Sequence, residues 1–441
     1  MKNNYFKNLY ISSFDKNYYS KITLKSPEKY KEIEQFSELK NNLITSGSNF
    51  SYAPLGIDSK SLVLDMKKFN RILHFDKKKK EITVEAGIKI SEFLNFTLDH
   101  DLWIPQLPGY PYITLGGAVA TNSHGKSSGT DGTIRRMVKK IIIYHKDHGW
   151  LNLSNEENQE IFNLTIGGLG LTGTIVSITF QLEDFIFKDF ITIRKKMVSV
   201  KDCLIELKKN ILKDTFVYSW NMAQDFENFG KGYFFESKLE KNILKKKIKI
   251  PKKKNIFFPS LCLWNKFTIK LANLFFYKLQ SLEKSPSQEE FLKVIFPYVG
   301  KELYFKMFGS KGLIESQLLV AENKLEQFLD EFKFFYKSEK PLITLFSLKN
   351  MSGEQAFIRF EGNRICVTFD FVNNKKNLNF LKILDKLCIK YGILPSIIKD
   401  SRIDKITFDK CYIYADEFRE KLIKFDKKRI YKSEVSRRLE I

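Results

Sequence analysis

The sequence predicts a mixed α+β protein of two domains, and three observations predict it. The chain has 441 residues with 43% hydrophobic content, which is more than one hydrophobic core ordinarily serves. Residues 43–182 contain short β-branched runs separated by turns and helical stretches. From about residue 185 the strands alternate with longer amphipathic helices. We therefore expect a first domain over 1–183, a second over 184–390 with an antiparallel sheet flanked by helices, and a C-terminal segment over 391–441.

The first domain contains four clear strand patterns and two helix patterns. The strands are expected at LVLDM (62–66), EITVEAG (81–87), KKIIIYH (139–145) and TGTIVSITFQL (172–182). Apolar residues at helical spacing predict a helix over 90–102, and a shorter pattern predicts another over 155–167.

The second domain reads as strands and helices in alternation. Strands are expected at 188–200, 216–225, 231–239, 312–321, 342–351, 356–362 and 364–372. Helices are expected at 200–212, 260–282, 323–337 and 377–392, the last one ended by Gly392. Residues 397–441 are mostly helical in pattern, and the lysine-rich segment 239–260 is interpreted as a mobile excursion.

The charge of the chain is strongly positive but is carried mainly by lysine. The net charge is +23, and of the 74 basic residues only 11 are arginine. Proteins that read nucleic acids usually rely on arginine for bidentate contacts, so nucleic acid is not the expected partner. A composition rich in Lys, Asn, Ile and Phe is also what an AT-biased genome encodes. Attraction to an anionic membrane surface or a phosphorylated lipid stays open beside that explanation.

Targeting and metal signals are absent from the sequence pattern. There is no run of 18 uncharged apolar residues and no apolar segment near the N-terminus, which favours a cytoplasmic location. The five cysteines are widely separated and form no CxxC pair. We therefore expect reduced thiols and no metal site.

Three glycine-rich stretches carry the functional signal. TLGGAVATNSHGKSSGTDGT (114–133) has five glycines around a histidine and a lysine, ITSGSNFSYAP (44–54) is a polar loop, and IGGLGLTG (166–173) is dense in glycine. Glycine lets another group approach the backbone and lets several N–H groups point at one anion. None of the stretches fits the P-loop or Rossmann pattern. Together they predict a large phosphate-bearing cofactor held by backbone amides.

Two of these stretches carry a resemblance to a known family. PGYPYITLGGAVATNSHGK (108–126) and IGGLGLTGTI (166–175) resemble the PCMH-type FAD-binding domain of flavoproteins of the vanillyl-alcohol-oxidase type. KDSRIDKITFDKCY (399–412) and the closing SEVSRRLEI resemble the branch of that family that oxidises polyprenylphosphoryl ribose. The resemblance covers nearly the whole chain and implies that the C-terminal segment returns to the flavin.

The resemblance implies a set of residues that hold FAD. These are Thr45, Ser46, Gly47, Ser48, Asn49, Phe50, Ser51, Tyr52, Gly109, Thr114, Leu115, Gly116, Gly117, Thr121, Asn122, Ser123, His124 and Ile175. Tyr52 stands where covalent members have the histidine that bonds the flavin, so non-covalent FAD is expected. The 47–54 loop departs from the family pattern G-x-G-R-S-Y-G-D, because its second glycine, its arginine and its aspartate are replaced.

Oxidation of a secondary alcohol requires a group that handles the hydroxyl proton and one that stabilises the charge that develops beside the flavin. By the resemblance, Lys399 of the KDSR motif is the first catalytic candidate and His124 the second. A solvated surface lysine and a structural histidine in a turn are the alternatives.

Four further residues are candidates for substrate contact. Lys126 is placed to hold a phosphate or sugar hydroxyls, and Trp220 to form a pocket wall or part of the core. Cys366 and Gln317 match pocket positions of the family, while Glu315 replaces a second pocket glutamine. A cysteine in a strand is otherwise a small core residue.

The expected function is FAD-dependent oxidation of a ring hydroxyl on a lipid-linked sugar phosphate, a polyprenyl-phosphate-linked pentose. A partner NAD(P)-dependent short-chain reductase would complete an epimerisation, and the enzyme would be cytoplasmic, with peripheral contact at the inner membrane left open. Two alternatives remain. One is an oxidase of a soluble sugar, polyol or aldonolactone, although no histidine follows His148 to form the H-W-[AG]-K motif of the aldonolactone branch. The other is a basic nucleic-acid or membrane-binding protein without enzyme activity.

Overall fold

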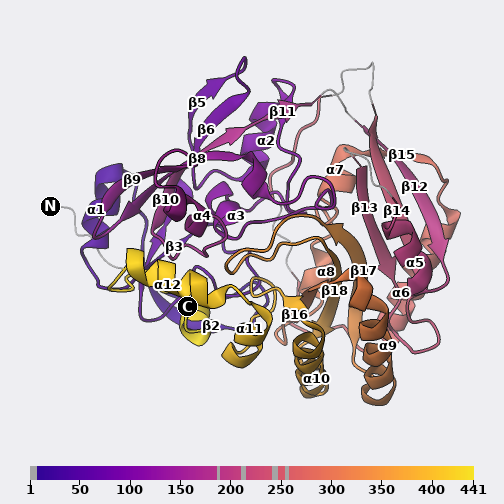
Figure 1. Ribbon diagram of the computed structural model, residues 1–441. Coiled ribbons are helices and arrows are strands. Elements are labelled where there is room, and N and C mark those ends of the chain that lie inside the picture. The colour runs from indigo at the N-terminus through magenta and orange to yellow at the C-terminus, as the bar shows by residue number, and fades with distance from the viewer. Residues whose placement is uncertain (1–6, 186–188, 210–214, 241–246, 254–257) are drawn as a thin grey trace.

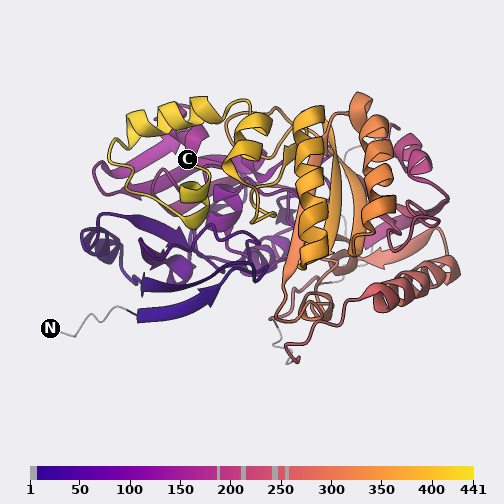
Figure 2. The same ribbon diagram turned by 90° about the horizontal axis from the view of Figure 1, so that it is seen from below.

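The computed structural model describes residues 7–185, 189–209, 215–240, 247–253 and 258–441. Figure 1 shows the N-terminal elements, from indigo to magenta, beside a large sheet drawn from magenta to orange. The yellow C-terminal helices lie along the N-terminal half, as Figure 2 also shows. The expected α+β class is confirmed.

The N-terminal half contains two main sheets. The first has the order β1-β2-β4-β3, with β1 Lys7–Ser12, β2 Tyr19–Lys25, β4 Leu62–Asp65 and β3 Leu43–Ser46. In it β2 and β3 both run parallel to β4. The second is antiparallel with the order β5-β6-β10-β8-β9: β5 Ile72–Asp76, β6 Glu81–Glu85, β10 Thr174–Gln181, β8 Val138–His145 and β9 Gly149–Ser154. The four strands expected here are therefore confirmed.

Short helices and turns connect these strands. They are α1 Tyr30–Ser37, η1 Met66–Lys68, α2 Ile90–Leu98, α3 Leu115–Ala120, η2 Ile134–Met137 and α4 Gln159–Thr165, with the two-residue strands β7 Leu102–Trp103 and β11 Glu183–Asp184 paired together. α2 and α4 confirm the two expected helices, each shorter than the sequence pattern. β1, β2 and α1 lie in a region for which the sequence predicted no element.

One antiparallel sheet of eight strands dominates the remainder of the chain. Its order is β15-β12-β14-β13-β17-β18-β16-β19, with β15 Ser287–Glu290, β12 Asp189–Met197, β14 Gly232–Glu240, β13 Thr215–Asn221, β17 Ile343–Met351, β18 Arg364–Val372, β16 Leu313–Val320 and β19 Leu394–Pro395. The accompanying helices are α5 Val200–Leu207, α6 Lys266–Leu282, α7 Phe291–Ile295, α8 Leu303–Lys306, α9 Glu322–Glu339 and α10 Lys375–Tyr391. The expected antiparallel sheet flanked by helices is confirmed.

The long helices α9 and α10 cover one face of this sheet (Figure 2). α9 buries Leu325, Phe328, Leu329, Phe332 and Tyr336, which recur at the helical spacing of three or four residues. Its Phe332 ring stacks on Phe369 of β18 with the ring centroids 4.6 Å apart. α10 ends at Gly392 in the left-handed conformation (φ +62°), as the sequence predicted.

Two expectations for the second domain are wrong. Residues 356–362 form no strand, because β17 and β18 pair directly with each other up to Met351 and Arg364 and residues 352–363 are the loop that joins them. The helix expected over 260–282 begins only at Lys266, where Asn265 caps it by accepting hydrogen bonds from two backbone N–H groups.

The lysine-rich segment 239–260 is described in part, since residues 241–246 and 254–257 lie outside the described residues. Its described residues 247–253 lie against the N-terminal half. The backbone N–H of Ile250 donates to the side chain of Asn95 at 2.8 Å, and the Tyr112 hydroxyl donates to the carbonyl of Pro251 at 2.9 Å. These hydrogen bonds attach residues 247–253 to the N-terminal half, so the interpretation as a mobile excursion is wrong for these residues.

The C-terminal segment contacts both halves of the molecule. It holds α11 Lys405–Cys411, α12 Ala415–Phe425 and α13 Glu434–Arg438. β19 pairs with β16 of the large sheet, while the Lys432 N–H donates to the carbonyl of Leu43 at 2.8 Å. Residues 394–441 therefore cross from the large sheet back to the N-terminal half.

Candidate cofactor and substrate site

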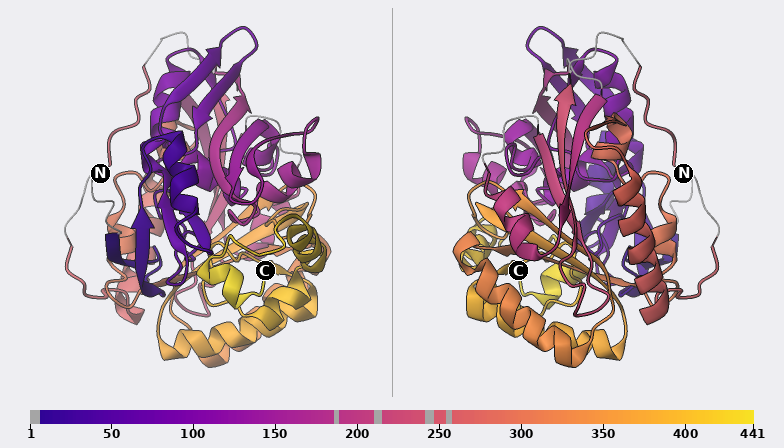
Figure 3. Two further views of the ribbon diagram at one scale, coloured as in Figure 1. Left: turned by 90° about the vertical axis from the view of Figure 1, so that its left-hand side faces the viewer. Right: turned by 90° about the vertical axis from the view of Figure 1, so that its right-hand side faces the viewer.

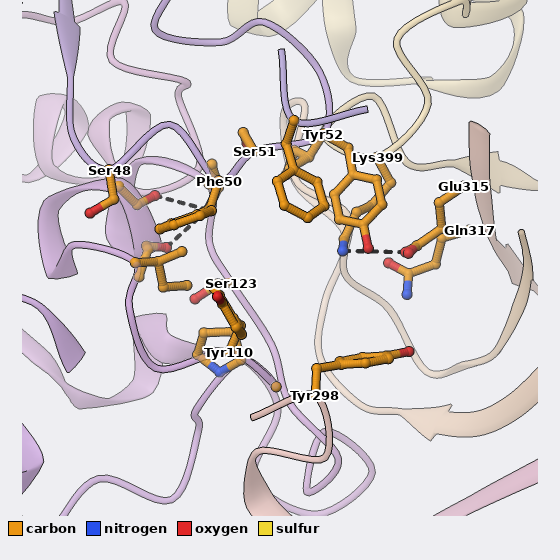
Figure 4. Close-up of a pocket in the computed structure, with 18 of the residues that line it drawn as sticks. Ser48, Phe50, Ser51, Tyr52, Tyr110, Ser123, Tyr298, Glu315, Gln317 and Lys399 are labelled. Atoms are coloured by element: carbon orange, nitrogen blue, oxygen red, sulfur yellow. Dashed lines mark hydrogen bonds and ion pairs between the residues drawn. The ribbon is translucent and has the colours of Figure 1, made fainter. Parts of the chain in front are cut away.

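A cavity of about 1130 Å³ lies between the N-terminal half and the large sheet. It is lined by the 45–52 loop, the 113–126 stretch, strands of the large sheet and residues 396–399. Figure 4 shows Ser48, Phe50 and Ser123 on one side of this space, with Glu315 and Gln317 facing them from the other. Pockets for small ligands usually occupy about 300–1,000 Å³, so this cavity has room for a large cofactor and a substrate together.

The 45–52 loop and the start of α3 are packed closely. A Cβ atom at Gly47 would lie 2.2 Å from Oγ1 of Thr114, so only glycine fits there. Thr114 is the N-cap of α3, and its hydroxyl accepts from the Gly117 N–H at 3.3 Å. Gly47 thereby lets the loop pack against the start of α3, and both line the cavity.

The cavity wall holds polar atoms that the protein itself does not satisfy. Among the described residues, the hydroxyl oxygens of Ser48 and Ser123, Oδ1 of Asn122 and Nζ of Lys126 are buried without a hydrogen-bond partner. All four residues line the cavity. Buried polar groups normally have partners, so these atoms indicate a polar ligand. They and the exposed backbone of the glycine stretches fit a dinucleotide cofactor.

The residues expected to hold the cofactor lie together, with one exception. Those that line the cavity are Thr45, Ser46, Gly47, Ser48, Asn49, Phe50, Ser51, Tyr52, Gly109, Thr114, Gly116, Gly117, Thr121, Asn122, Ser123, His124 and Ile175. The exception is Leu115, whose side chain is fully buried in the core beneath α3.

Backbone hydrogen bonds bring the KDSR motif to the cavity. The Ala53 N–H donates to the carbonyl of Ile398 at 3.0 Å, and the Ser396 N–H donates to the carbonyl of Gln317 at 2.8 Å. Behind them, Arg402 donates to Asp400 at 2.9 Å and to Asp385 of α10. The aspartate and arginine of the motif are thus anchors, and they leave Lys399 free to face the cavity.

Lys399 lies within a group of polar side chains. Its Nζ is 3.3 Å from Oε1 of Glu315 and 3.9 Å from the ring centroid of Tyr52. Burial and the Glu315 charge hold the pKa of Tyr52 well above its usual range. Figure 4 shows the three side chains meeting at one point. Because Lys399 pairs with a carboxylate, it presents a positive charge at this wall.

A second carboxylate lies behind the first. Asp370 is fully buried, and burial together with the Glu315 charge raises its pKa well above the usual range. Its Oδ2 is 2.7 Å from the hydroxyl of Tyr304. A protonated Asp370 beside Glu315 leaves one negative charge at this place, where two would repel.

His124 is held by a lysine that the sequence did not identify. Lys349 of β17 donates from Nζ to Nδ1 of His124 at 2.9 Å and to the carbonyl of Gly125 at 2.8 Å. Burial, with the nearby Lys349 and Lys399 charges, lowers the pKa of His124 well below its usual value. The imidazole is therefore neutral, and when Lys349 is an ammonium, which can only donate to Nδ1, the ring proton lies on Nε2. His124 can donate to a substrate oxygen.

Among the residues expected to contact the substrate, Lys126 has the most strongly shifted pKa. Burial, with the charges of Lys349 and Lys301, lowers the pKa of Lys126 to about 7. Its Nζ lies 3.7 Å from the ring centroid of Tyr218. An ammonium without a hydrogen-bond partner, stacked on an aromatic ring, is suited to receive an anion.

Of the three remaining residues expected to contact the substrate, two line the cavity and one lies in the hydrophobic core. Trp220 and Gln317 line the cavity, and the Trp220 ring lies 4.5 Å from that of Phe276. Cys366 is fully buried in the core, where it pairs in register with Lys349. It therefore lies behind the wall and supports Lys349.

Lysines outnumber carboxylates in the wall. Lys16, Lys126, Lys253, Lys301, Lys306, Lys349 and Lys399 line the cavity, against Glu302 and Glu315. Lys349 could have been found from the sequence, since it interrupts the apolar strand pattern LITLFSLKNM. Lys253, whose Nζ lies 4.3 Å from the ring centroid of Phe50, had no such signal.

Two features are absent from the described part of the chain. Within it, no helix is both long and apolar enough to cross a membrane. No group of three or more His, Cys, Asp or Glu residues in the same ranges could hold a metal ion.

Comparison with known proteins gives a consistent result. Residues 23–154 match the family described as FAD binding domain. The chain is 24% identical over 416 residues to decaprenylphosphoryl-beta-D-ribose oxidase of Mycolicibacterium smegmatis, an alignment that covers 90% of this chain and 89% of the relative.

Other relatives match only part of the chain. L-galactono-1,4-lactone dehydrogenase of Arabidopsis thaliana is 26% identical over 34% of this chain and 24% of its own length. L-gulonolactone oxidase of Mus musculus is 32% identical over 27% of each protein. The FAD-binding domain match over residues 23–154, these relatives and the cavity that the matched residues help to line together make the chain an FAD-dependent oxidoreductase.

Proposed function

We propose that the chain oxidises a secondary hydroxyl, at C2 of ribose, on a polyprenyl-phosphate-linked pentose to a ketone. The observation that carries this proposal is the near full-length similarity to decaprenylphosphoryl-beta-D-ribose oxidase. The lysine-rich wall of the cavity supports it, because a phosphodiester beside the sugar needs positive charge. The ketone would pass to an NAD(P)-dependent short-chain reductase, which completes an epimerisation used in cell-envelope polysaccharide synthesis.

The two halves of the molecule divide the work in this proposal. Residues 1–183 hold FAD, residues 184–390 provide the substrate wall, and residues 391–441 carry Lys399 to the boundary. Bound FAD supplies the acceptor for the two electrons that leave the alcohol carbon. Lys399 places positive charge beside the cofactor, and Glu315, at 3.3 Å from it, is the nearby carboxylate that can accept the hydroxyl proton. His124 orients the substrate through Nε2–H.

The first expected result concerns the cofactor. The purified protein should be yellow, and acid precipitation should leave the flavin in the supernatant, because Tyr52 occupies the place of the bonding histidine. Absorbance of both fractions measures this. Flavin that stays with the precipitate contradicts non-covalent binding, and colourless protein that cannot be reconstituted with FAD contradicts the function as a whole.

The substrate is tested by anaerobic bleaching of the bound flavin. A short-chain polyprenyl-phosphate-linked pentose should bleach it, whereas free ribose should not at the same concentration. A soluble aldonolactone forms the second arm, because the partial similarity to two lactone enzymes favours this candidate next. Bleaching by the lactone alone would replace the proposed substrate.

The alternative of a nucleic-acid-binding protein without enzyme activity is tested by a binding measurement. A basic protein that only binds nucleic acid would show salt-sensitive binding to it and no flavin bleaching by any sugar. We expect no such binding.

The lowered pKa of Lys126 predicts a pH dependence. The ammonium form, which binds a phosphate, prevails below about pH 7 and is lost as the pH rises through that value. For the phosphate-bearing substrate kcat/KM should therefore fall as the pH rises through about 7. Lys126→Met should lower kcat/KM by about tenfold to hundredfold below this pH and flatten the profile.

The matched control for this profile is Lys390→Met. Lys390 is a surface lysine of α10 whose Nζ pairs with Glu331 at 2.7 Å, remote from the cavity wall. It should keep the profile of the original protein. If Lys126→Met retains the full pH dependence, Lys126 is not the group that titrates.

A further inference from the structure

Helix α6, Lys266–Leu282, turns its apolar face away from the protein. Along the helix only Ile269 and Asn273 are buried. The exposed fractions are 74% for Phe267, 57% for Leu271, 68% for Phe275 and 74% for Leu282. The right-hand view of Figure 3 shows α6 on the outside of the large sheet.

These exposed residues form one stripe. Positions 267, 271, 274, 275 and 282 recur at intervals of three, four or seven residues and so share a face of the helix. Lys278 lies on the same face, between Phe275 and Leu282. Single exposed apolar residues are common on protein surfaces, but a group of them on one helix face marks an interaction site. The inner face is held in place by Phe276 against Trp220 and by Tyr277 against Tyr233, with ring centroids 4.5 and 5.2 Å apart.

The charge of α6 indicates whether the exposed face binds a second copy of the protein or a membrane. It carries Lys266, Lys270 and Lys278, all exposed, and it contains no aspartate or glutamate. A second copy of this helix would bring like charges together. An exposed apolar face on a helix whose charged residues are all lysines is the pattern of helices that lie in the interface of an anionic membrane.

Part of α6 also lines the cavity. Ala272, Phe275 and Phe276 of α6 line the cavity, as do Pro297 and Phe305 across from them. Phe275 is thus both a member of the exposed stripe and a part of the cavity wall. A membrane that covered the stripe would therefore lie against this part of the cavity wall.

We propose that α6 docks the protein on the surface of an anionic membrane, with Phe267, Leu271, Leu274, Phe275 and Leu282 inserted among the lipids. The mouth of the cavity then faces the lipid, and a lipid-linked substrate enters with its chain passing between α6 and residues 297–305. The entry of substrate rests on the proposed function, whereas the binding to the membrane does not.

The test uses the full-length protein with FAD bound and vesicles of phosphatidylcholine with and without phosphatidylglycerol. We expect the protein to float with the vesicles that contain phosphatidylglycerol and to be released by high salt. The triple variant Phe267→Ser, Leu271→Ser, Leu282→Ser should reduce the bound fraction about tenfold or more. None of the three residues lines the cavity, so FAD should stay bound.

The matched control is Phe334→Ser in α9, a residue that is 71% exposed on another helix. It should bind vesicles as the original protein does. Equal vesicle binding by the triple variant overturns the proposal. So does an original protein that ignores vesicles and forms a dimer that the triple variant cannot form, as measured by light scattering.

Membrane docking and the proposed reaction can fail separately. If the original protein binds vesicles through α6 but no lipid-linked sugar bleaches its flavin, the docking surface stands and the proposed function fails. If a short-chain soluble substrate bleaches the flavin but vesicle binding does not depend on the stripe, the function stands and the docking surface fails.

Discussion

Replacement of Lys399 by alanine should lower the rate of flavin reduction by substrate about a thousandfold or more while FAD stays bound. Lys399 is the residue that brings positive charge to Glu315 and Tyr52 at the cavity wall. Without it the carboxylate of Glu315 faces the reacting centre unpaired. Stopped-flow bleaching under anaerobic conditions measures the loss, and the visible spectrum before mixing measures FAD occupancy.

Two comparisons make this result specific. Lys399→Arg keeps a positive charge that does not dissociate, so it should recover part of the rate if charge is what matters. Lys390→Ala removes another lysine that is paired with a glutamate and should change nothing. Near-normal reduction in Lys399→Ala would remove this residue from the chemistry.

The second large effect is expected at Gly117, where a phenylalanine should abolish FAD binding. A Cβ atom there would meet only Oγ1 of Thr114, at 3.1 Å, so a larger side chain projects into the cavity. It would fill the space beside the exposed amides of α3. We expect an affinity for FAD at least about a hundredfold lower, since the bulk competes directly with the ligand.

Gly117→Ala is the matched control, because one methyl group leaves the cavity open. It should bind FAD with little change. Circular dichroism of the Gly117→Phe variant should match that of the original protein, which separates a blocked site from an unfolded chain. A yellow Gly117→Phe protein would place the cofactor elsewhere.

Much of the fold was predictable because strong local patterns decided it. β8, β10, β16 and β18 are apolar runs of the length of a strand, and α9 and α10 repeat apolar residues at helical spacing. The strand predicted over 356–362 is wrong because the apolar residues of this stretch are buried in a loop. In that loop Glu361 accepts a hydrogen bond from Asn122 at 2.9 Å. Burial produces the same composition in a loop as in a strand.

The candidate site was predictable where it depends on backbone. The glycine stretches predicted that other groups pack closely against the backbone, and Gly47 packs in this way against Thr114. Lys349 interrupts an apolar strand pattern and so could be singled out, but its role depends on the pairing of β17 with β18 and on His124, 225 residues away in sequence. Lys253 reaches the cavity only through the attachment of residues 247–253 to the N-terminal half. No local pattern encodes such tertiary contacts.

The hydrogen bond from Ala53 to Ile398 also bears on how the protein is made. The loop near the N-terminus and the KDSR motif are synthesised far apart in time, and neither completes the wall alone. Contacts of such long sequence separation form late and slowly during folding. The nascent chain therefore cannot acquire its cofactor in final form before residue 398 has left the ribosome, and N-terminal fragments should be poor flavin binders even when their sheets are intact.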